Sequence, residues 1–158
     1  MSSTTFSGPV TSTAGFITGT GVNTPVTAST LAVTADAYNG QTINLSRAAG
    51  IVVTLPAATG SNAVYTFVVS TSVTSNSYKI QVANATDVIQ GTINVAGTTG
   101  TPFGSLPASD TITMNGSTQG GLAGSYVRIT DIASGVFLTS GSSLGSGTVI
   151  TPFSAAVS

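Results

Sequence analysis

Residues 51–82 read IVVTLPAATGSNAVYTFVVSTSVTSNSYKIQV, and this stretch contains three short apolar runs separated by turn-forming residues. The run at 78–82 alternates apolar and polar side chains, which is the period of a β-strand with one buried face. The run at 51–55 is rich in β-branched residues and stops at a proline, and the run at 64–69 is apolar on both faces. We therefore expect three strands here, of which 64–69 lies inside its sheet rather than at an edge.

Similar runs continue on both sides of this stretch, at a spacing that suits a sandwich or a barrel. Val and Ile together number 27 against 7 Leu, and an apolar fraction of 41% with a net charge of −1 favours a folded chain. We predict an all-β protein, an antiparallel β-sandwich or jelly-roll-like domain of about nine strands with no helix of three turns. The other expected strands lie near 31–33, 43–45, 89–95, 112–114, 126–132 and 136–140, with turns at Asn39-Gly40 and Ala133-Ser134-Gly135.

Composition divides the chain into three zones. Residues 1–28 are rich in Gly, Thr and Ser and have too few regularly spaced apolar residues to form a core of their own. We expect this zone to be an extended arm that docks on another surface, residues 29–140 to be the β-sandwich body, and residues 141–158 to be a Gly/Ser-rich C-terminal tail. The candidate contact residues of the arm are isolated apolar side chains and one proline, namely Phe6, Pro9, Val10, Phe16 and Ile17.

Only seven residues are charged, three basic and four acidic, and the chain has no His, Cys or Trp. The absence of His and Cys excludes a Ser-His-Asp triad, a cysteine nucleophile, ordinary zinc and haem sites, and disulfides. Three basic residues cannot form a surface that neutralises nucleic-acid phosphates. We therefore expect no enzyme, with no catalytic residues, no cofactor, no metal ion, no small-molecule substrate and no nucleic-acid partner.

The first residues, MSSTTF, lack the basic region and the apolar run of a secretory signal. No apolar stretch approaches the roughly 18 residues of a membrane-spanning helix, so we expect no membrane association. A net charge near zero protects a free monomer poorly against association. We therefore expect the chain to be a permanent part of an assembly.

Two patterns resemble nucleophile sites, and each has a simpler structural interpretation. The stretch Gly141-Ser142-Ser143-Leu144-Gly145 matches G-x-S-x-G, but the chain has no His base and a Gly/Ser-rich sequence follows where a helix is required. Lys79 is the only lysine, and Ser75 and Ser77 do not give the S-x-x-K spacing of a Ser/Lys dyad. We expect Lys79 to be a solvated side chain on the outer face of its strand.

The four aspartates leave open a pair of carboxylates for glycoside hydrolysis. Asp36, Asp87 and Asp110 each lie beside a turn just before a strand, where Asp commonly caps or bends the backbone, so we expect structural roles for them. Arg128 and Asp131 lie in one expected strand at opposite parity, and neighbouring strands could pair any of these charges. A calcium site is disfavoured because successive aspartates are separated by about twenty residues or more.

The four tyrosines are Tyr38, Tyr65, Tyr78 and Tyr126. They could stack on sugars if they gathered on one surface. Tyr78 follows the parity of the core, and most buried tyrosines only cover the edge of a core. A carbohydrate site therefore stays open here as the less favoured hypothesis.

Parts of the sequence resemble structural proteins of tailed bacteriophages. The stretch FSGPVTSTAGF at residues 6–16 resembles an F-S-G-P-[VI]-x-S-x-x-G-F arm of such proteins, and the body resembles β-rich head decoration (cement) proteins and fibre-like proteins. The resemblance spans roughly residues 6–140. Relatives often carry an aromatic such as Trp in the closing hairpin, where this chain has Phe137, and the tail to Ser158 is an addition. The matching stretches of the body are 40–45, 51–61, 65–69, 77–85, 89–93 and 124–129.

The resemblance implies a homotrimeric virion protein that binds the outer surface of the phage head and reinforces it, with the major capsid protein of the same virion as its partner. It also implies that the arm docks on the capsid, and strand addition to a neighbour's sheet edge is the expected mode because it needs only main-chain hydrogen bonds. The alternative is a tail-fibre or receptor-binding module that recognises host surface glycans. An adhesin or surface-layer module is a further one.

Overall fold

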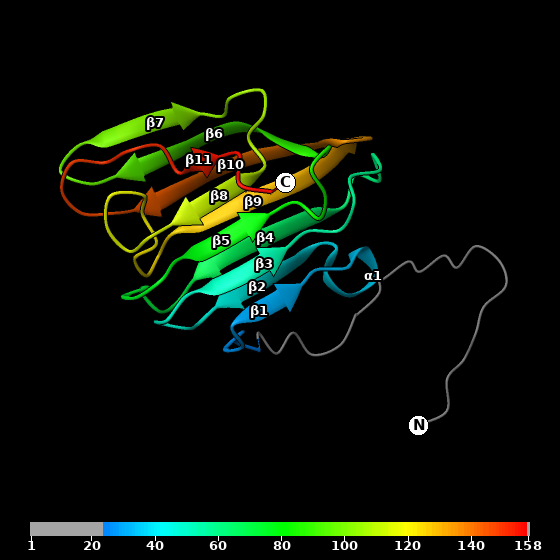
Figure 1. Cartoon of the computed structure of the whole chain (residues 1–158). Coiled ribbons are helices and arrows are strands. Elements are labelled where there is room, and N and C mark those ends of the chain that lie inside the picture. The colour runs from blue at the N-terminus through cyan, green and yellow to red at the C-terminus, as the bar shows by residue number, and fades with distance from the viewer. Residues whose placement is uncertain (1–23, 158) are drawn as a thin grey trace, which may run out of the picture.

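Two β-sheets packed face to face make up the computed structural model, which describes residues 24–157 (Figure 1). The five-stranded sheet has the order β1-β3-β5-β8-β11, and the six-stranded sheet has the order β2-β4-β9-β10-β6-β7. The predicted all-β sandwich is confirmed. Its elements are β1 (Thr30–Ala32), α1 (Ala35–Tyr38), β2 (Gln41–Leu45), β3 (Ile51–Thr54), β4 (Val64–Val69), β5 (Tyr78–Gln81), β6 (Val88–Ala96), β7 (Gly100–Gly104), β8 (Thr111–Met114), β9 (Tyr126–Ala133), β10 (Val136–Leu144) and β11 (Phe153–Ser154).

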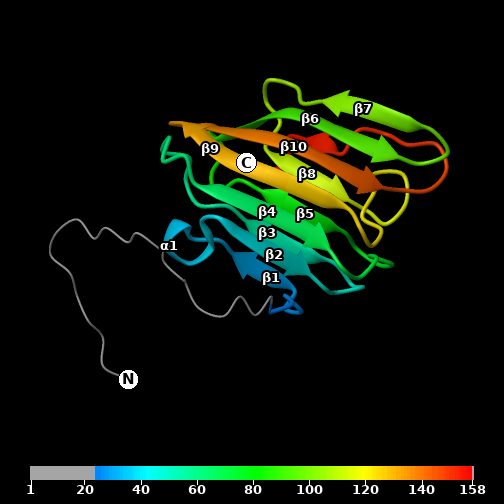
Figure 2. The same ribbon diagram turned by 180° about the vertical axis from the view of Figure 1, so that it is seen from behind.

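The strand directions differ from the antiparallel expectation, because the chain crosses from one sheet to the other after each of its first five strands. A strand that returns to its own sheet after one strand in the opposite sheet runs in the same direction as its predecessor. Accordingly, β1–β3, β3–β5 and β2–β4 are parallel pairs. The pair β6–β10, whose strands are further apart in the chain, is also parallel, and the other five pairs are antiparallel. Both sheets are therefore mixed, and views from opposite sides show the two layers (Figures 1 and 2).

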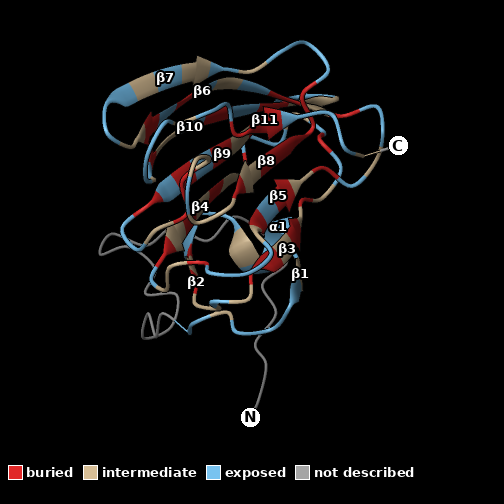
Figure 3. Cartoon of the chain, turned by 60° about the vertical axis from the view of Figure 1, so that its left-hand side comes forward, coloured by how far each residue is buried: buried red, intermediate tan, exposed pale blue. Residues whose placement is uncertain are grey.

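The core lies between the two sheets and is made by the inward half of each alternating strand (Figure 3). Strand β5 shows this most clearly, because Tyr78 and Ile80 are fully buried while Lys79 is exposed, as its sequence predicts. Strand β4 has neighbours on both sides, β2 and β9, so it is an interior strand as expected. The largest fully buried side chains are Tyr65, Tyr78, Phe67, Phe137, Leu45, Ile51, Leu55, Ile80, Ile89, Ile93, Ile112 and Met114.

The two turn sequences have different outcomes. Ala133-Ser134-Gly135 closes the hairpin between β9 and β10, as expected, with Gly135 at φ +79°. Asn39-Gly40 does not join two paired strands. It ends the short helix α1, where Asn39 N donates to Ala35 O at 3.0 Å and Gly40, at φ +72°, turns the chain into β2. Gly40 and Gly135 both adopt the left-handed conformation that Gly permits. The sequence predicts this conformation, but it does not predict whether the turn joins two paired strands or a helix and a strand.

The C-terminal segment belongs to the sandwich. Strand β10 continues to Leu144, and β11 pairs antiparallel with β8. Phe153 is only 7% exposed and packs in the core. The boundary expected at residue 140 therefore does not separate a tail from the body.

We predict that Phe153→Ala lowers the free energy of unfolding by about 3 kcal/mol, because it removes a buried aromatic ring and leaves a cavity. Ile150→Ala is the matched control in the same segment, since Ile150 is 51% exposed and its truncation should change stability by less than about 0.5 kcal/mol. Urea unfolding followed by circular dichroism measures both. Equal stability of the two variants would contradict the placement of the C-terminal segment in the core.

Candidate functional site

The junction between the N-terminal arm and the body lies along the edge of the six-stranded sheet. The predicted contact residues of the arm lie outside the described residues, namely Phe6, Pro9, Val10, Phe16 and Ile17. Residues 24–28 are described, and Val26 forms a parallel bridge with Leu45 of the edge strand β2. Val26 N donates to Asn44 O at 2.8 Å, and Ser46 N donates to Val26 O at 3.0 Å. The arm thus joins the body through main-chain hydrogen bonds on a sheet edge.

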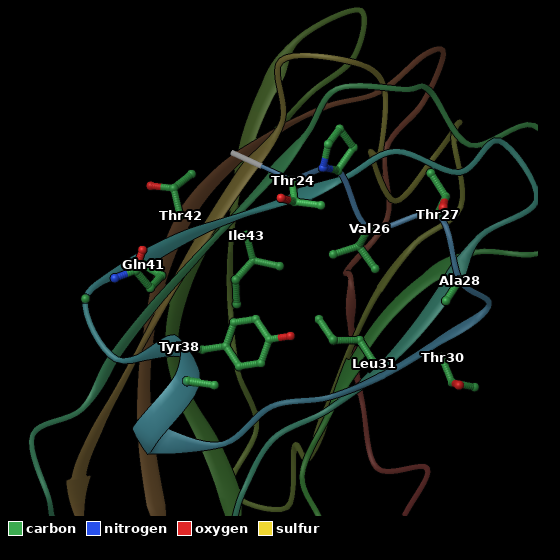
Figure 4. Close-up of a pocket in the computed structure, with 13 residues that line it drawn as sticks. Thr24, Val26, Thr27, Ala28, Thr30, Leu31, Tyr38, Gln41, Thr42 and Ile43 are labelled. Carbon is green, nitrogen blue, oxygen red and sulfur yellow. The ribbon is translucent and has the colours of Figure 1, made fainter. Parts of the chain in front are cut away.

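A pocket of about 710 Å³ opens beside this junction, between the edge strands β1 and β2 and the helix α1. Figure 4 shows the side chains of Val26, Leu31, Tyr38 and Ile43 pointing toward one another across it. The other lining residues are Thr, Ala, Pro, Gly and Gln, and no charged side chain lines the pocket. Such a pocket suits an apolar side chain or an extended peptide, and it offers no acid, base or metal ligand.

Among residues 24–157, two buried polar side-chain atoms have no hydrogen-bond partner, and both lie at this junction. They are Asn44 Oδ1 and Arg47 Nε. The main chain of Asn44 bonds Val26, and Arg47 Nη1 donates to Thr27 O at 3.3 Å, so both residues contact the segment that leads into the arm. An unpaired buried polar group costs about 1–3 kcal/mol, so this junction is less well satisfied than the rest of the described body.

Asp131 holds the loop that connects β3 to β4. Its carboxylate is 2% exposed and points inward from β9. It accepts main-chain hydrogen bonds from Thr59, Gly60 and Ser61 at 3.1, 2.7 and 3.0 Å, and side-chain hydrogen bonds from the Thr59 and Ser61 hydroxyls at 3.2 and 2.7 Å. Burial alone would raise its pKa, but the hydrogen bonds from Ser61, Gly60 and Thr59 outweigh burial and lower the pKa to about 2.

Two further aspartates act on loops in the same way. Asp87 Oδ2 accepts from Ala58 N at 2.8 Å and from Asn84 Nδ2 at 2.9 Å. Asp110 accepts from the Thr111 hydroxyl at 2.8 Å and from the main-chain amides of residues 156 and 157 at 2.8 and 3.2 Å. The structural roles expected for Asp87 and Asp110 are confirmed, since each carboxylate fixes a turn or a chain end.

Asp36 lies in the first turn of α1 and is exposed. It is therefore the one aspartate of this chain that reaches the surface, since the other three are buried. The alternation of β9 correctly predicts that Arg128 and Asp131 lie on opposite faces of the strand. It does not predict that Asp131 accepts hydrogen bonds from loop amides instead of pairing with a cation. The signal that was available is Thr59-Gly60-Ser61, a run of donors just before a strand.

The two candidate nucleophile patterns lie in ordinary strand and loop environments. Ser143 is buried in β10, where its hydroxyl accepts from Gly121 N at 3.0 Å and lies 3.3 Å from the Ser125 hydroxyl. Lys79 is exposed on β5, as predicted. Its neighbours on the adjacent strands are Val52 and Thr113, so the strand pairing places no serine beside Lys79.

The four tyrosines do not gather on one surface. Tyr65 and Tyr78 are buried in the core, and Tyr38 lines the pocket beside the arm junction, whereas Tyr126 is exposed on β9. The Tyr78 hydroxyl donates to Thr71 O at 2.8 Å and accepts from Arg47 N at 2.9 Å. Burial raises the pKa of both core tyrosines, and the nearby Asp131 raises the pKa of Tyr65 further.

Within residues 24–157, no group of three or more acidic, His or Cys side chains is placed to hold a metal ion. The same residues include no helix with the length and apolar character needed to cross a membrane. Comparison with family models, curated proteins and solved structures gave no match to this chain.

We predict that Asp131→Asn destabilises the protein by about 2 kcal/mol at pH 7, because a pKa lowered from 3.8 to about 2 stabilises the folded state by that amount while the carboxylate is ionised. This contribution is complete above the unfolded pKa of 3.8 and is lost as pH falls through the folded pKa. The stability difference between the two proteins should therefore shrink between pH 4 and pH 2. Chemical unfolding across this range measures it, with Asp36→Asn as the exposed control, and a difference that stays constant with pH would contradict the assignment.

Proposed function

We propose that this protein is a structural component of a tailed-phage virion, a decoration protein that binds the outer surface of the head and stabilises it. Its partner is the major capsid protein of the same virion, and it acts as a homotrimer. The observation that carries the proposal is the arm junction, where Val26 forms a parallel bridge with the edge strand β2 through two main-chain hydrogen bonds. This geometry supports an arm that continues as an extended strand and binds a neighbouring sheet edge in the same manner.

Three other features of the junction support a docking role. The pocket between β1 and β2 has an apolar centre formed by Leu31, Tyr38 and Ile43, and it lies next to the point where the arm leaves the body. Arg47 ties the segment that leads into the arm to the body, because its Nη1 donates to Thr27 O at 3.3 Å. The carboxylates of Asp87, Asp110 and Asp131 accept hydrogen bonds from loop amides, which supports a structural rather than a catalytic role.

We predict that replacing Phe6, Phe16 and Ile17 together with Ser weakens binding to purified heads at least about 100-fold, because three apolar anchors each contribute about 1–2 kcal/mol when buried at an interface. Co-sedimentation with heads that lack this protein measures the binding. Leu106→Ser with Ile150→Ser is the matched control, since both side chains are apolar and exposed but lie outside the arm. Undiminished binding of the arm variant would refute the docking role. Binding to a glycan array together with absence from purified heads would favour the tail-fibre alternative.

We also predict that head binding depends little on salt. The chain has seven charged residues, and three of its four carboxylates are buried, so few ions are available at an interface. Raising NaCl from about 0.1 M to about 1 M shortens the Debye length from about 10 Å to about 3 Å, yet the dissociation constant should change by less than about threefold. A loss of binding of about 100-fold over this range would instead indicate an electrostatic interface.

A further inference from the structure

Within the described residues, the outward face of β9 and β10 carries most of the exposed large apolar side chains. Six large apolar side chains are exposed in the described part of the chain, and four of them point outward from these two adjacent strands. They are Tyr126, Ile132, Leu138 and Leu144, of which Leu138 is 47% and Tyr126 46% exposed. We call this surface the β9–β10 face.

The β9–β10 face carries one charge. Arg128 points outward from the middle of β9 between Thr66 of β4 and Ser140 of β10. Val68 lies opposite Tyr126 in the register of the β4–β9 pair and extends the apolar surface toward β4. No aspartate lies beside Arg128 in either strand pair, so its guanidinium is available to a carboxylate of another molecule.

The outer face of the five-stranded sheet has a different character. Its outward side chains include Thr54, Lys79, Gln81 and Thr113, and no large apolar side chain is exposed on its strands. On the strands themselves, the exposed large apolar side chains thus lie on the six-stranded sheet, while Leu106 and Ile150 are exposed in loops. This asymmetry indicates a specific contact, and the second side provides a matched control surface.

The β9–β10 face lies at the centre of the six-stranded sheet, between β4 and β6. Six strands about 4.8 Å apart span about 24 Å, and the nine residues of β10 span about 30 Å. The whole outer side of this sheet therefore covers about 700 Å², which approaches the roughly 800 Å² that each partner contributes to a standard protein interface, and the β9–β10 face is its central, most apolar part.

We infer that the β9–β10 face packs, head to tail, against a second copy of this chain. The surface used on the second copy is the edge formed by α1 and the edge strand β2, which we call the α1 edge. Two-fold stacking of two such faces would bring the Arg128 side chains of both copies toward each other across an uncharged surface, which is unfavourable. The one exposed aspartate, Asp36, lies on α1, and α1 contacts the edge strand β2. The negative charge that complements Arg128 therefore lies on another part of the molecule than the β9–β10 face, and a second copy can supply it. Contacts between unlike surfaces close into a trimeric ring when successive copies are related by a rotation of about 120°, and otherwise continue as an open filament.

This inference rests on the homotrimer of the proposed function and names the surface that forms it, but it does not depend on the arm. The test uses the purified full-length chain without capsids, at concentrations up to about 100 μM, and measures molar mass by sedimentation velocity. We expect a trimer for the wild type and for Gln81→Glu on the opposite sheet. Leu138→Glu should be monomeric, because it buries a charge in the contact, and its circular dichroism spectrum should match the wild type since residue 138 is exposed. The unfolding midpoint of the wild type, but not of the variant, should rise with protein concentration.

The charge pair provides the second part of the test. Arg128→Asp and Asp36→Arg should each raise the dissociation constant of the assembly about tenfold, and the two changes combined in one chain should restore it. A monomeric wild type, or an assembly that survives Leu138→Glu, would overturn the inference. If Leu138→Glu keeps the oligomer but loses head binding, the face contacts the capsid instead. Failure of the double variant to restore assembly would overturn the head-to-tail contact through Asp36.

Discussion

The carboxylate of Asp131 is the interaction on which the rest of the sandwich depends. The chain crosses between the two sheets repeatedly, and each crossing carries main-chain amides that no strand can pair. At the crossing from β3 to β4, one carboxylate accepts five hydrogen bonds from three consecutive residues, while Asp87 holds the residue just before them. Asp131 lies on β9, and Asp87 lies just before β6. Because both carboxylates hold this loop, its position relative to the six-stranded sheet is fixed, and β3 and β4 stay in separate layers.

The crossings also explain where sequence reasoning succeeds and where it stops. Alternation of apolar and polar residues is a property of one strand, so the strand at 78–82 and its inward side chains could be read directly. Which strand lies beside it depends on the loops, and the sequence 56–63 does not state that its amides bind Asp131, about 70 residues away in the chain. The prediction that the sandwich is antiparallel was wrong for this reason. Successive short strands commonly form hairpins, whereas the loops after the first five strands of this chain lead to the opposite sheet.

The candidate site divides in the same way. The surface position of Lys79 and the roles of Asp87 and Asp110 followed from local pattern, since parity and turn chemistry are local. The pocket beside the arm junction did not, because Leu31, Tyr38 and Ile43 come from three different elements and meet only in the folded chain. The C-terminal zone shows the same limit: its Gly and Ser content indicates a tail, yet Phe153 lies in the core and Val149 and Val157 pack against it.

The described surface carries few negative charges because most aspartates of the chain are buried and bound to loops. Three of the four carboxylates are consumed inside the fold as hydrogen-bond acceptors for loops, so the described surface retains Asp36 together with the exposed cations Lys79 and Arg128. A surface with so few ions is poorly protected against association, and its exposed apolar side chains lie mainly on one sheet. Because Asp87, Asp110 and Asp131 turn their carboxylates to loop amides inside the fold, they leave few anionic groups on the described surface, and the apolar side chains exposed on β9 and β10 lie in a weakly charged surrounding.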